Sequence, residues 1–364
     1  ANCGLPYHIG EVIEDRSKLL LQTPERLRDT LDIDVRNGVE IVAIDPAAKT
    51  VRARVVDSGE EYDESYDALG LTPGAVPFKP PVPGIDLDSV RVLRRISDMD
   101  AIKAMVDGDG DAARTGGIRH AVVIGAGYIG LEMAESLHER GVAVEVVELA
   151  NQILPPLDRE MTRAIEKYVQ AEGVRLHLGT AATEFSRLPD GRTRVALGNG
   201  TLIETDMVMM AAGVRPDTRL AEHAGLEIGP RGGIAVDEHM RTSDPSIWAA
   251  GDAVEVRHHV LPGSWVIPLA GPANRQGRTA AESICGRDSV FPTVQGTSVV
   301  KVFDMVAGGT GASQRQLTQA GIEHSSVCTH PHGHAGYYPG TAMMSMKVLF
   351  SPSDGRVLGA QIAG

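Results

Sequence analysis

A glycine pattern between an apolar run and a helix-like segment is the feature that most constrains the fold. Residues 121–124 are Ala-Val-Val-Ile, a continuous apolar run typical of a parallel strand buried on both faces. Residues 125–130 follow as Gly-Ala-Gly-Tyr-Ile-Gly, and an amphipathic segment then extends to Arg140. A second apolar strand ends on Glu148, 18 residues after the last glycine of the pattern. This order predicts a Rossmann-type unit that binds a dinucleotide.

Each glycine of the pattern has a separate expected role. Gly125 permits the tight turn, Gly127 lets the backbone approach a pyrophosphate, and Gly130 lets the helix pack on the strand. The helix N-terminus supplies free N–H groups and the positive end of its dipole to the phosphates. Glu148 is expected to accept hydrogen bonds from a ribose diol, which favours NADH over NADPH. The alternative is a glycine-rich turn without a ligand.

Length, charge and composition exclude several classes of protein. A chain of 364 residues is long enough for two or three domains. Its net charge of -13 argues against nucleic acid and against an anionic membrane surface as partners. The longest apolar runs, of about ten residues, are too short to span a bilayer, and no signal peptide is recognisable. The cytoplasm is therefore the expected location.

The remainder of the chain predicts a mixed α/β protein. Thr23 can cap a helix whose first residue is Pro24. Alternating apolar and polar residues over 38–68 predict short antiparallel strands. Further expected elements are a helix at 158–172, strands at 174–178, 194–197 and 206–211, a strand-turn-helix set at 234–290, a mixed α+β region at 295–364, and loops at 73–83 and 107–117.

A second motif places a carboxylate after a strand. Residues 242–253 are Thr-Ser-Asp-Pro-Ser-Ile-Trp-Ala-Ala-Gly-Asp-Ala, which predicts a strand that ends in a Gly-Asp turn. Asp252 would then lie at the carboxyl edge of a sheet, where α/β proteins bind ligands. From the residues alone, a helix-capping role for Asp252 is equally compatible.

The cysteines and histidines give weaker signals by themselves. Cys3, Cys285 and Cys328 are far apart, with neither CxxC nor zinc spacing, which suits a reducing compartment. A cysteine near a terminus is most often a small buried hydrophobic residue. Three histidines alternate over 330–334, but a polar loop is favoured there over a metal site, so no metal is predicted.

Together these motifs resemble the pyridine nucleotide-disulfide oxidoreductases. Residues 242–253 are similar to the flavin-binding signature of that family, residues 211–216 to its Ala/Thr-Gly turn, and residues 72–75 to a segment before its NAD domain. The resemblance implies nicotinamide-dinucleotide contacts from Gly125, Gly127, Tyr128, Ile129, Gly130, Glu148 and Gly213. It implies FAD contacts from Cys3, Pro73, Arg94, Gly251, Asp252, Leu269, Ala270 and Ala273.

The first seven residues, Ala-Asn-Cys-Gly-Leu-Pro-Tyr, resemble the single-cysteine motif of coenzyme A disulfide reductases and differ from the CxxxxC of glutathione-type reductases. The resemblance implies that Cys3 forms a mixed disulfide with an external thiol, since one redox cysteine has no internal partner. A cysteine before a helix N-terminus is expected to favour the thiolate. Substrate contacts are implied for Asn2 and Asn274, and Tyr337 is implied as an acid that reaches the partner subunit's cysteine in a homodimer.

The expected fold is α/β, with two Rossmann-like dinucleotide-binding domains (FAD and NAD, of three-layer ββα/βα type) and a C-terminal α+β dimerisation domain. Expected boundaries are 1–115 and 236–292 for the FAD domain, 116–235 for the NAD(P) domain and 293–364 for the interface domain. The family's N-terminal FAD βαβ unit and its C-terminal interface helices have no counterpart in these residues. We therefore interpret the chain as a segment of a longer protein.

The expected function is FAD-dependent reduction of coenzyme A disulfide, or of a related thiol persulfide, by NADH, with NADPH as the alternative reductant. In this family, some members carry a downstream rhodanese domain and reduce persulfides. One alternative is an NADH oxidase or peroxidase in which Cys3 cycles through sulfenic acid. Another is a truncated nucleotide-binding protein without enzymatic activity.

Overall fold

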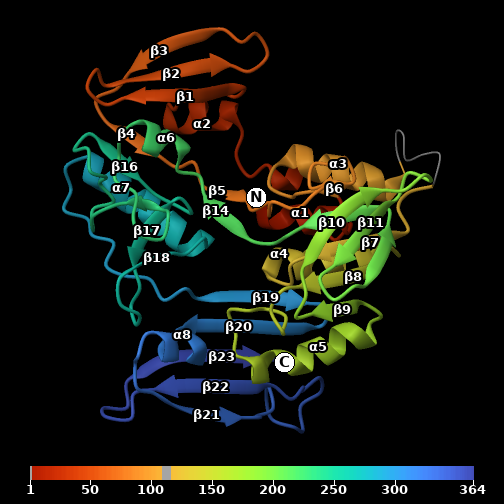
Figure 1. Ribbon diagram of the computed structural model, residues 1–364. Helices are drawn as coiled ribbons and strands as arrows, with labels where there is room; N and C mark the ends of the chain where they lie inside the picture. The colour runs from red at the N-terminus through yellow and green to blue at the C-terminus, as the bar shows by residue number, and fades with distance from the viewer. Residues whose placement is uncertain (1, 109–115) are drawn as a thin grey trace. The chain divides into compact units, whose positions relative to one another are not determined.

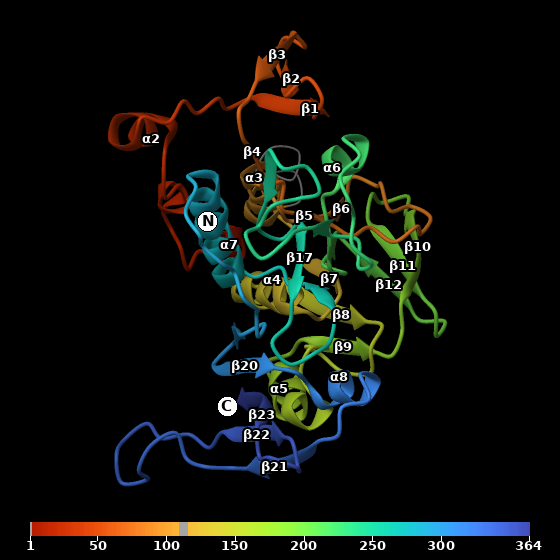
Figure 2. The same ribbon diagram turned by 90° about the vertical axis from the view of Figure 1, so that its left-hand side faces the viewer.

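The computed structural model describes residues 2–108 and 116–364. The chain packs as two compact units (Figures 1 and 2). The first contains residues 1–20, 77–213 and 297–364, and the second contains residues 21–76 and 214–296. Most of the loop predicted at 107–117 lies outside the described residues.

A five-stranded parallel sheet forms the centre of the first unit. Its strand order is β6 (Val90–Arg91), β13 (Met207–Met210), β7 (His120–Ile124), β8 (Ala143–Glu148) and β9 (Arg175–Leu178). The side chains of β7 after His120 and all those of β13 are buried, as expected for strands covered on both faces. The sequence-predicted parallel strands are therefore confirmed.

Different layers cover the two faces of this sheet. One face packs against α1 (Leu5–Ile9), α3 (Ile96–Asp107), α4 (Tyr128–Glu139) and α5 (Arg159–Ala171). The other packs against an antiparallel sheet of β10 (Ala182–Arg187), β11 (Thr193–Leu197) and β12 (Leu202–Thr205). Alternate residues of one strand serve the two cores: Val123 faces the helices and Val122 the small sheet. This is the expected three-layer ββα arrangement.

The last part of the chain forms an antiparallel sheet. Its order is β19 (Ser298–Val302), β20 (Met305–Gly311), β23 (Val357–Ala363), β22 (Ser345–Phe350) and β21 (Ser325–Thr329), with α8 (Gln314–Gln319) between β20 and β21 in the chain. A buried ion pair joins it to α5: Lys347 Nζ lies 2.9 Å from Asp158 Oδ2 and also contacts Glu160. Only 1% of Lys347 is exposed.

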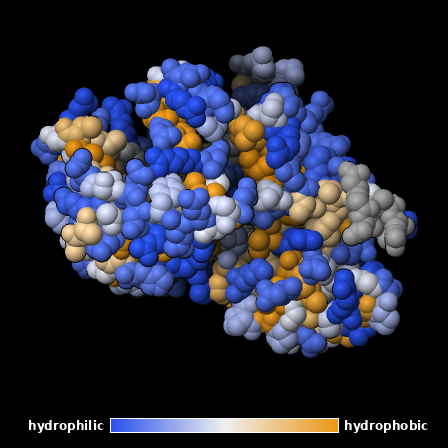
Figure 3. Space-filling model, turned by 90° about the horizontal axis from the view of Figure 1, so that it is seen from above, coloured by the Kyte–Doolittle hydropathy of each residue, from blue (hydrophilic) through white to orange (hydrophobic). Residues whose placement is uncertain are grey.

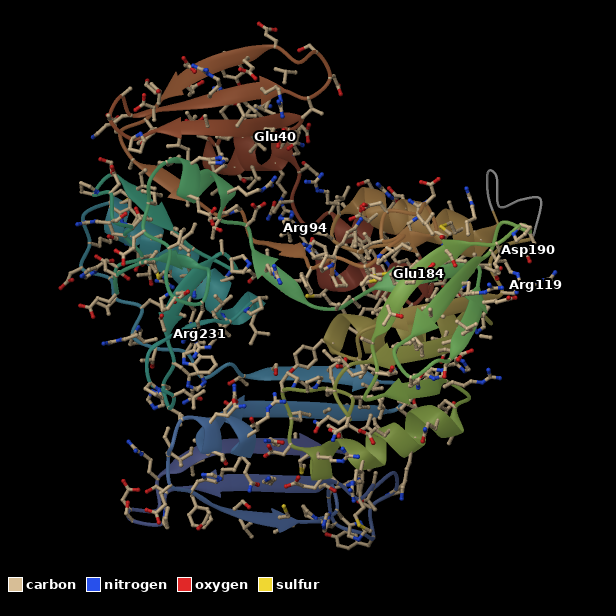
Figure 4. All side chains as sticks on the ribbon, in the orientation of Figure 1. Glu40, Arg94, Arg119, Glu184, Asp190 and Arg231 are labelled. Carbon is tan, nitrogen blue, oxygen red and sulfur yellow. The ribbon has the colours of Figure 1, made fainter. Side chains whose placement is uncertain are left out.

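The second unit combines small sheets with helices. An antiparallel meander contains β1 (Val39–Asp45), β2 (Thr50–Val55) and β3 (Glu61–Ser65). Surface ion pairs cross it, such as Arg54–Glu40 at 2.7 Å, whose Glu40 is labelled in Figure 4. Two further sheets contain β4 (Leu69–Leu71) beside β16 (Ile247–Ala249), and β15 (Ile234–Ala235), β17 (Val254–Arg257) and β18 (Ser264–Val266).

The remaining elements are short, except for α7. They are the 3-10 turns η1 (Asn2–Gly4) and η2 (Arg16–Leu19), strands β5 (Ala75–Pro77) and β14 (Val214–Pro216), and helices α2 (Pro24–Leu31), α6 (Arg219–His223) and α7 (Ala270–Ile284). The predicted cap of α2 is present, because Thr23 Oγ1 accepts a hydrogen bond from Arg26 N at 3.2 Å. The surface seen in Figure 3 is mostly hydrophilic, with hydrophobic residues in separate groups. Among the described helices, none combines the length and apolar composition needed to cross a bilayer.

Candidate functional site

The glycine loop connects β7 to α4 in the manner the sequence predicts. Gly125 has φ +107°, and a Cβ there would lie 2.3 Å from Ala211 O. A Cβ on Gly130 would lie 2.0 Å from Gly125 O, so only glycine lets α4 approach the loop. Gly127 has open space beside its Cα and is the N-cap of α4, where no side chain caps the helix. The free N–H groups of this turn can receive an anion.

Glu148 ends β8 beside this loop, and its carboxylate contacts the backbone. Oε2 accepts a hydrogen bond from Ala126 N at 2.7 Å, and Oε1 accepts one from Ala150 N at 2.8 Å. Glu148 therefore holds the glycine loop and the loop after β8 together, a role that the sequence did not predict. Each carboxylate oxygen has more than one acceptor position, so these bonds are compatible with a ribose contact.

A cleft of about 430 Å³ opens over the carboxyl ends of β7, β8 and β13. Of the described residues that line it, Glu148 is the single charged one, and the others are mainly apolar. The lining includes the predicted glycines Gly125, Gly127 and Gly213. Gly213 has φ +105°, and its carbonyl accepts a hydrogen bond from Phe78 N at 2.9 Å. The glycine loop, the acid and Gly213 thus share one cleft that fits a dinucleotide.

Residues that the sequence analysis missed also line this cleft. Thr180 follows β9, and its hydroxyl is buried with no hydrogen-bond partner in the described part of the chain. A buried hydroxyl without a partner is costly, so a ligand group in the cleft would satisfy it. Phe78, Pro155 and Met210 supply apolar walls. These residues lie far from the glycine pattern in the sequence, so no local motif indicated that they line the same cleft.

Cys3 lies in η1, directly before α1, with an exposed and unpaired thiol. Leu19 packs closely on this turn, because a Cβ on Gly4 would lie 2.6 Å from Leu19 Cδ2. Asn2 is exposed beside the cysteine, whereas Leu5 is buried. The sequence-predicted position of the cysteine before a helix is therefore confirmed.

Tyr7 and Glu132 form a polar contact between the helix that follows Cys3 and α4. The Tyr7 hydroxyl on α1 donates to Glu132 Oε1 on α4 over 3.5 Å. Burial raises the pKa of Glu132 to about 7. Burial and the charge of Glu132 raise the pKa of Tyr7 to about 12, and the charge of Cys3 adds to that rise. Neither residue was identified from the sequence.

The predicted flavin-contact segments of the second unit meet at one sheet edge. β4 and β16 are parallel, so Pro73 and Gly251 follow strands that end on the same side. Gly251 has φ +89°, and its N–H donates to Gln276 Oε1 on α7 at 2.8 Å. Asp252 is half-buried, and this burial raises the pKa of its carboxyl. A half-buried carboxylate after Gly251 fits the ribityl contact that the resemblance implies.

The N-terminus of α7 lies beside that turn. Leu269 is the N-cap, no side chain caps the helix, and the first turn contains Ala270 and Ala273. A Cβ on Gly251 would lie 4.0 Å from the Cβ of Ala273, so small residues keep this corner open. Asn274 is exposed on the same helix. These residues of the second unit fit a flavin, whose ring a helix N-terminus can stabilise when it is anionic.

The remaining predicted residues lie in the first unit. Arg94, labelled in Figure 4, comes before α3, and its N–H donates to Asp98 Oδ2 at 3.0 Å. Tyr337 lies between β21 and β22 and is 92% exposed. In the same connection, His330 Nδ1 lies 3.0 Å from Ser345 Oγ. Within the described ranges, no three His, Cys, Asp or Glu side chains are grouped to hold a metal ion.

A cleft over a Rossmann glycine loop, together with an unpaired cysteine before a helix, defines a nicotinamide-dependent oxidoreductase class. The profile of the pyridine nucleotide-disulphide oxidoreductases matches residues 1–277. The chain belongs to this family, whose enzymes use FAD with NADH or NADPH.

Individual relatives span the whole chain. An NADH oxidase of Methanocaldococcus jannaschii is 35% identical over 100% of the chain and 78% of the relative. A coenzyme A disulfide reductase of Staphylococcus aureus is 31% identical over 100% of the chain and 80% of the relative. The crystal structure of reduced Bacillus anthracis CoADR-RHD superposes with a TM-score of 0.95 at 43% identity. That comparison covers 100% of this chain and 64% of the other.

Proposed function

We propose that the protein containing this chain is an NADH-dependent flavoprotein that reduces coenzyme A disulfide, or a related thiol persulfide, through a mixed disulfide on Cys3. The observation that carries the proposal is the exposed, unpaired thiol of Cys3 on a turn whose following helix packs against α4. The glycine loop begins that same α4, so one helix connects the proposed nucleotide site to the proposed thiol site. The two coenzyme A disulfide reductase relatives support the substrate class.

NADH is the preferred reductant in this proposal. Among the described residues that line the cleft, Glu148 is the single charged one, and none is a lysine or an arginine. A 2′-phosphate beside Glu148 would face a like charge without a cation to balance it. The ribose diol of NADH can instead donate to the carboxylate.

FAD would supply the two-electron relay between the nicotinamide and the sulfur. This chain would contribute the nucleophile and the proton chemistry. The Cys3 thiolate attacks one sulfur of the substrate disulfide, forms a new S–S bond and displaces one thiolate. Two electrons then cleave the mixed disulfide and return Cys3 to the thiolate while the second thiolate leaves. Tyr337 of the partner subunit is the proposed proton donor to a departing thiolate.

A homodimer is part of this proposal, since Tyr337 would act on the cysteine of the other copy. The side chain of Tyr337 is directed to solvent at 92% exposure. The antiparallel sheet nearby also exposes apolar side chains on β19, β21 and β22, namely Val299, Val327 and Met346. Exposed apolar sheet residues of this kind are typical of a surface that another chain covers. We further propose a cytoplasmic location. The proposed domain boundaries are those expected from the sequence, with the FAD domain at 1–115 and 236–292, the NAD(P) domain at 116–235 and the interface domain at 293–364.

The competing function is an NADH oxidase, which the Methanocaldococcus relative favours. In that case peroxide would oxidise Cys3 to sulfenic acid, and Cys3 would not form a mixed disulfide with a substrate thiol. The third candidate is a truncated protein that binds a nucleotide, contains no flavin and has no enzymatic activity.

One set of measurements separates these functions. NADH consumption is measured anaerobically with coenzyme A disulfide, and then separately with oxygen and with peroxide. We expect disulfide-dependent consumption, a flavin spectrum and a coenzyme A mass on Cys3. Cys3→Ser should abolish the disulfide reaction, whereas the exposed Cys285→Ser serves as the matched control. Oxygen uptake that equals NADH loss without disulfide would refute the proposal, and a colourless folded protein would favour the truncated alternative.

A further inference from the structure

The β8–α5 loop, residues 149–158, forms one wall of the cleft over the glycine loop. Leu149, Pro155 and Pro156 of this loop line the cleft. The conformation of the loop therefore determines the shape of the cleft on this side, and the contacts that hold the loop bear on nucleotide binding.

Leu154, in the second half of this loop, has a backbone conformation that other residues must hold. Its φ of +45° lies in the left-handed region, which is unfavourable for a bulky residue. Leu154 is fully buried, and its N–H donates to Ala126 O in the glycine loop at 2.8 Å. A strained conformation of this kind persists only where the surrounding contacts stabilise it. Displacement of the β8–α5 loop would disturb the glycine loop directly.

One of these contacts comes from helix α8, in the C-terminal part of the chain. Arg315 Nη2 donates to the carbonyl oxygen of Pro155, the residue after Leu154, at 3.0 Å. The two bonded residues are 160 positions apart in the sequence. Arg315 is exposed and is not part of the cleft lining. Its contact with the nucleotide site is therefore indirect, through the backbone of Pro155.

Helix α8 is itself held next to the end of the loop. Gln314 N donates to Asp158 Oδ1 at 3.1 Å, and Asp158 is the last residue before α5. Asp158 N donates in turn to Gln361 Oε1 on β23 at 2.8 Å. The backbone of Arg315 therefore has a defined position beside the loop, from which its side chain can hold the Pro155 carbonyl.

We propose that Arg315 is a positioning residue for the nicotinamide dinucleotide, because it holds the β8–α5 loop in the conformation in which the cleft accepts the nucleotide. This inference rests on the proposed nucleotide site over the glycine loop. When a binding-competent conformation is only partly populated, the apparent affinity falls by that fraction. Without Arg315 the loop can leave the strained conformation of Leu154, so the affinity falls while the chemistry of the bound nucleotide is unchanged.

The test is anaerobic reduction of the flavin by NADH in the full-length, flavin-containing protein, followed by flavin absorbance in a stopped-flow instrument. We expect Arg315→Ala to raise the half-saturating NADH concentration by about fivefold, the factor that corresponds to one hydrogen bond of average strength. The limiting rate should stay within about twofold of the wild-type rate. Arg315→Lys keeps a charged donor and should return the half-saturating concentration to within about twofold of the wild-type value.

Arg356→Ala, in the exposed turn between β22 and β23, removes the same positive charge and is the matched control. It should leave the half-saturating concentration unchanged, which separates the loop contact from long-range attraction of the anionic nucleotide. Three results overturn the inference: no change in Arg315→Ala, no recovery in Arg315→Lys, or an equal rise in Arg356→Ala. A fall in the limiting rate alone also overturns it.

Hydrogen exchange of the amides at 149–158, measured by mass spectrometry on the oxidised protein, provides an independent readout. Arg315→Ala should speed this exchange, and NAD⁺ should slow it in both proteins. Unchanged exchange in Arg315→Ala contradicts the inference. Failure of the proposed function is distinguishable, because neither measurement needs a disulfide. A wild-type protein that shows these effects but does not reduce coenzyme A disulfide would retain this inference and lose that function.

Discussion

Replacement of Lys347 by methionine tests whether the buried ion pair between β22 and α5 stabilises the first unit. Methionine keeps most of the alkyl packing of lysine and removes only the ammonium group. Three contacts disappear: those to Asp158 at 2.9 Å, to Glu160, and to Gln314 Oε1 at 2.7 Å. Lys347 is 1% exposed and Asp158 is buried, so water cannot replace the lost cation.

The expected cost follows from what Asp158 retains. Breaking a buried pair by removing one partner costs about 3–5 kcal/mol. The Asp158 carboxylate still accepts hydrogen bonds from Gln361 Nε2 at 2.8 Å and from Gln314 N at 3.1 Å. We therefore expect a loss of about 3 kcal/mol in the free energy of unfolding, at the lower end of that range. Lys347→Met combined with Asp158→Asn should recover part of this loss, because no uncompensated charge is then buried.

Urea denaturation at pH 7, followed by far-ultraviolet circular dichroism, measures this cost. Tryptophan fluorescence would be unsuitable, since Trp248 and Trp265 both lie in the second unit. Lys79→Met is the matched control, because Lys79 pairs at 3.2 Å with Asp86, which is 87% exposed. A surface pair of this kind contributes at most about 1 kcal/mol. The reasoning is refuted if Lys347→Met costs no more than Lys79→Met.

Three further predictions concern the cleft and the Glu132 carboxyl. Gly130→Ala should weaken NADH binding by at least about tenfold, since its Cβ would meet Gly125 O. Gly277→Ala should leave NADH binding unchanged, because a Cβ on this residue of α7 would point into open space; titration calorimetry measures the affinity of both variants. Glu148→Gln should raise the NADPH-to-NADH ratio of kcat/KM by about tenfold, and an unchanged ratio contradicts the charge argument. Burial raises the pKa of Glu132 from 4.5 to about 7, so stability should fall as pH rises through that interval, by at most about 3 kcal/mol. Glu132→Gln should lack this fall in urea titrations.

The central sheet of the first unit could be predicted because its sequence signals are local. The apolar run at 121–124, the glycines that follow and the period of α4 all act over a few residues. The structure confirms these elements and the steric reasons for Gly125 and Gly130. The predicted strands at 174–178 and 206–211 also correspond to β9 and β13.

Residues that act across long sequence separations could not be predicted in this way. Tyr7 and Glu132 are 125 positions apart, and nothing in either local sequence signals their contact. The same holds for Thr180, which lies in the cleft because β9, the strand before it, is next to β8 in the parallel sheet. Glu148 shows a subtler case: its position was predictable, but its hydrogen bonds to two backbone amides depend on loop conformations that no spacing specifies.

Helix α4 sets the distance and the angle between the glycine loop at its start and Glu132. Glu132 lies five positions after Gly127, which corresponds to about 7.5 Å of rise along the axis. Insertion of a single residue after Gly130 would turn Glu132 by about 100° around the helix, away from Tyr7, and would leave the glycine pattern at 125–130 intact. Length variation at this point of α4 would therefore separate nucleotide binding from the Tyr7–Glu132 contact, so a homologue with such an insertion could bind the nucleotide without that contact.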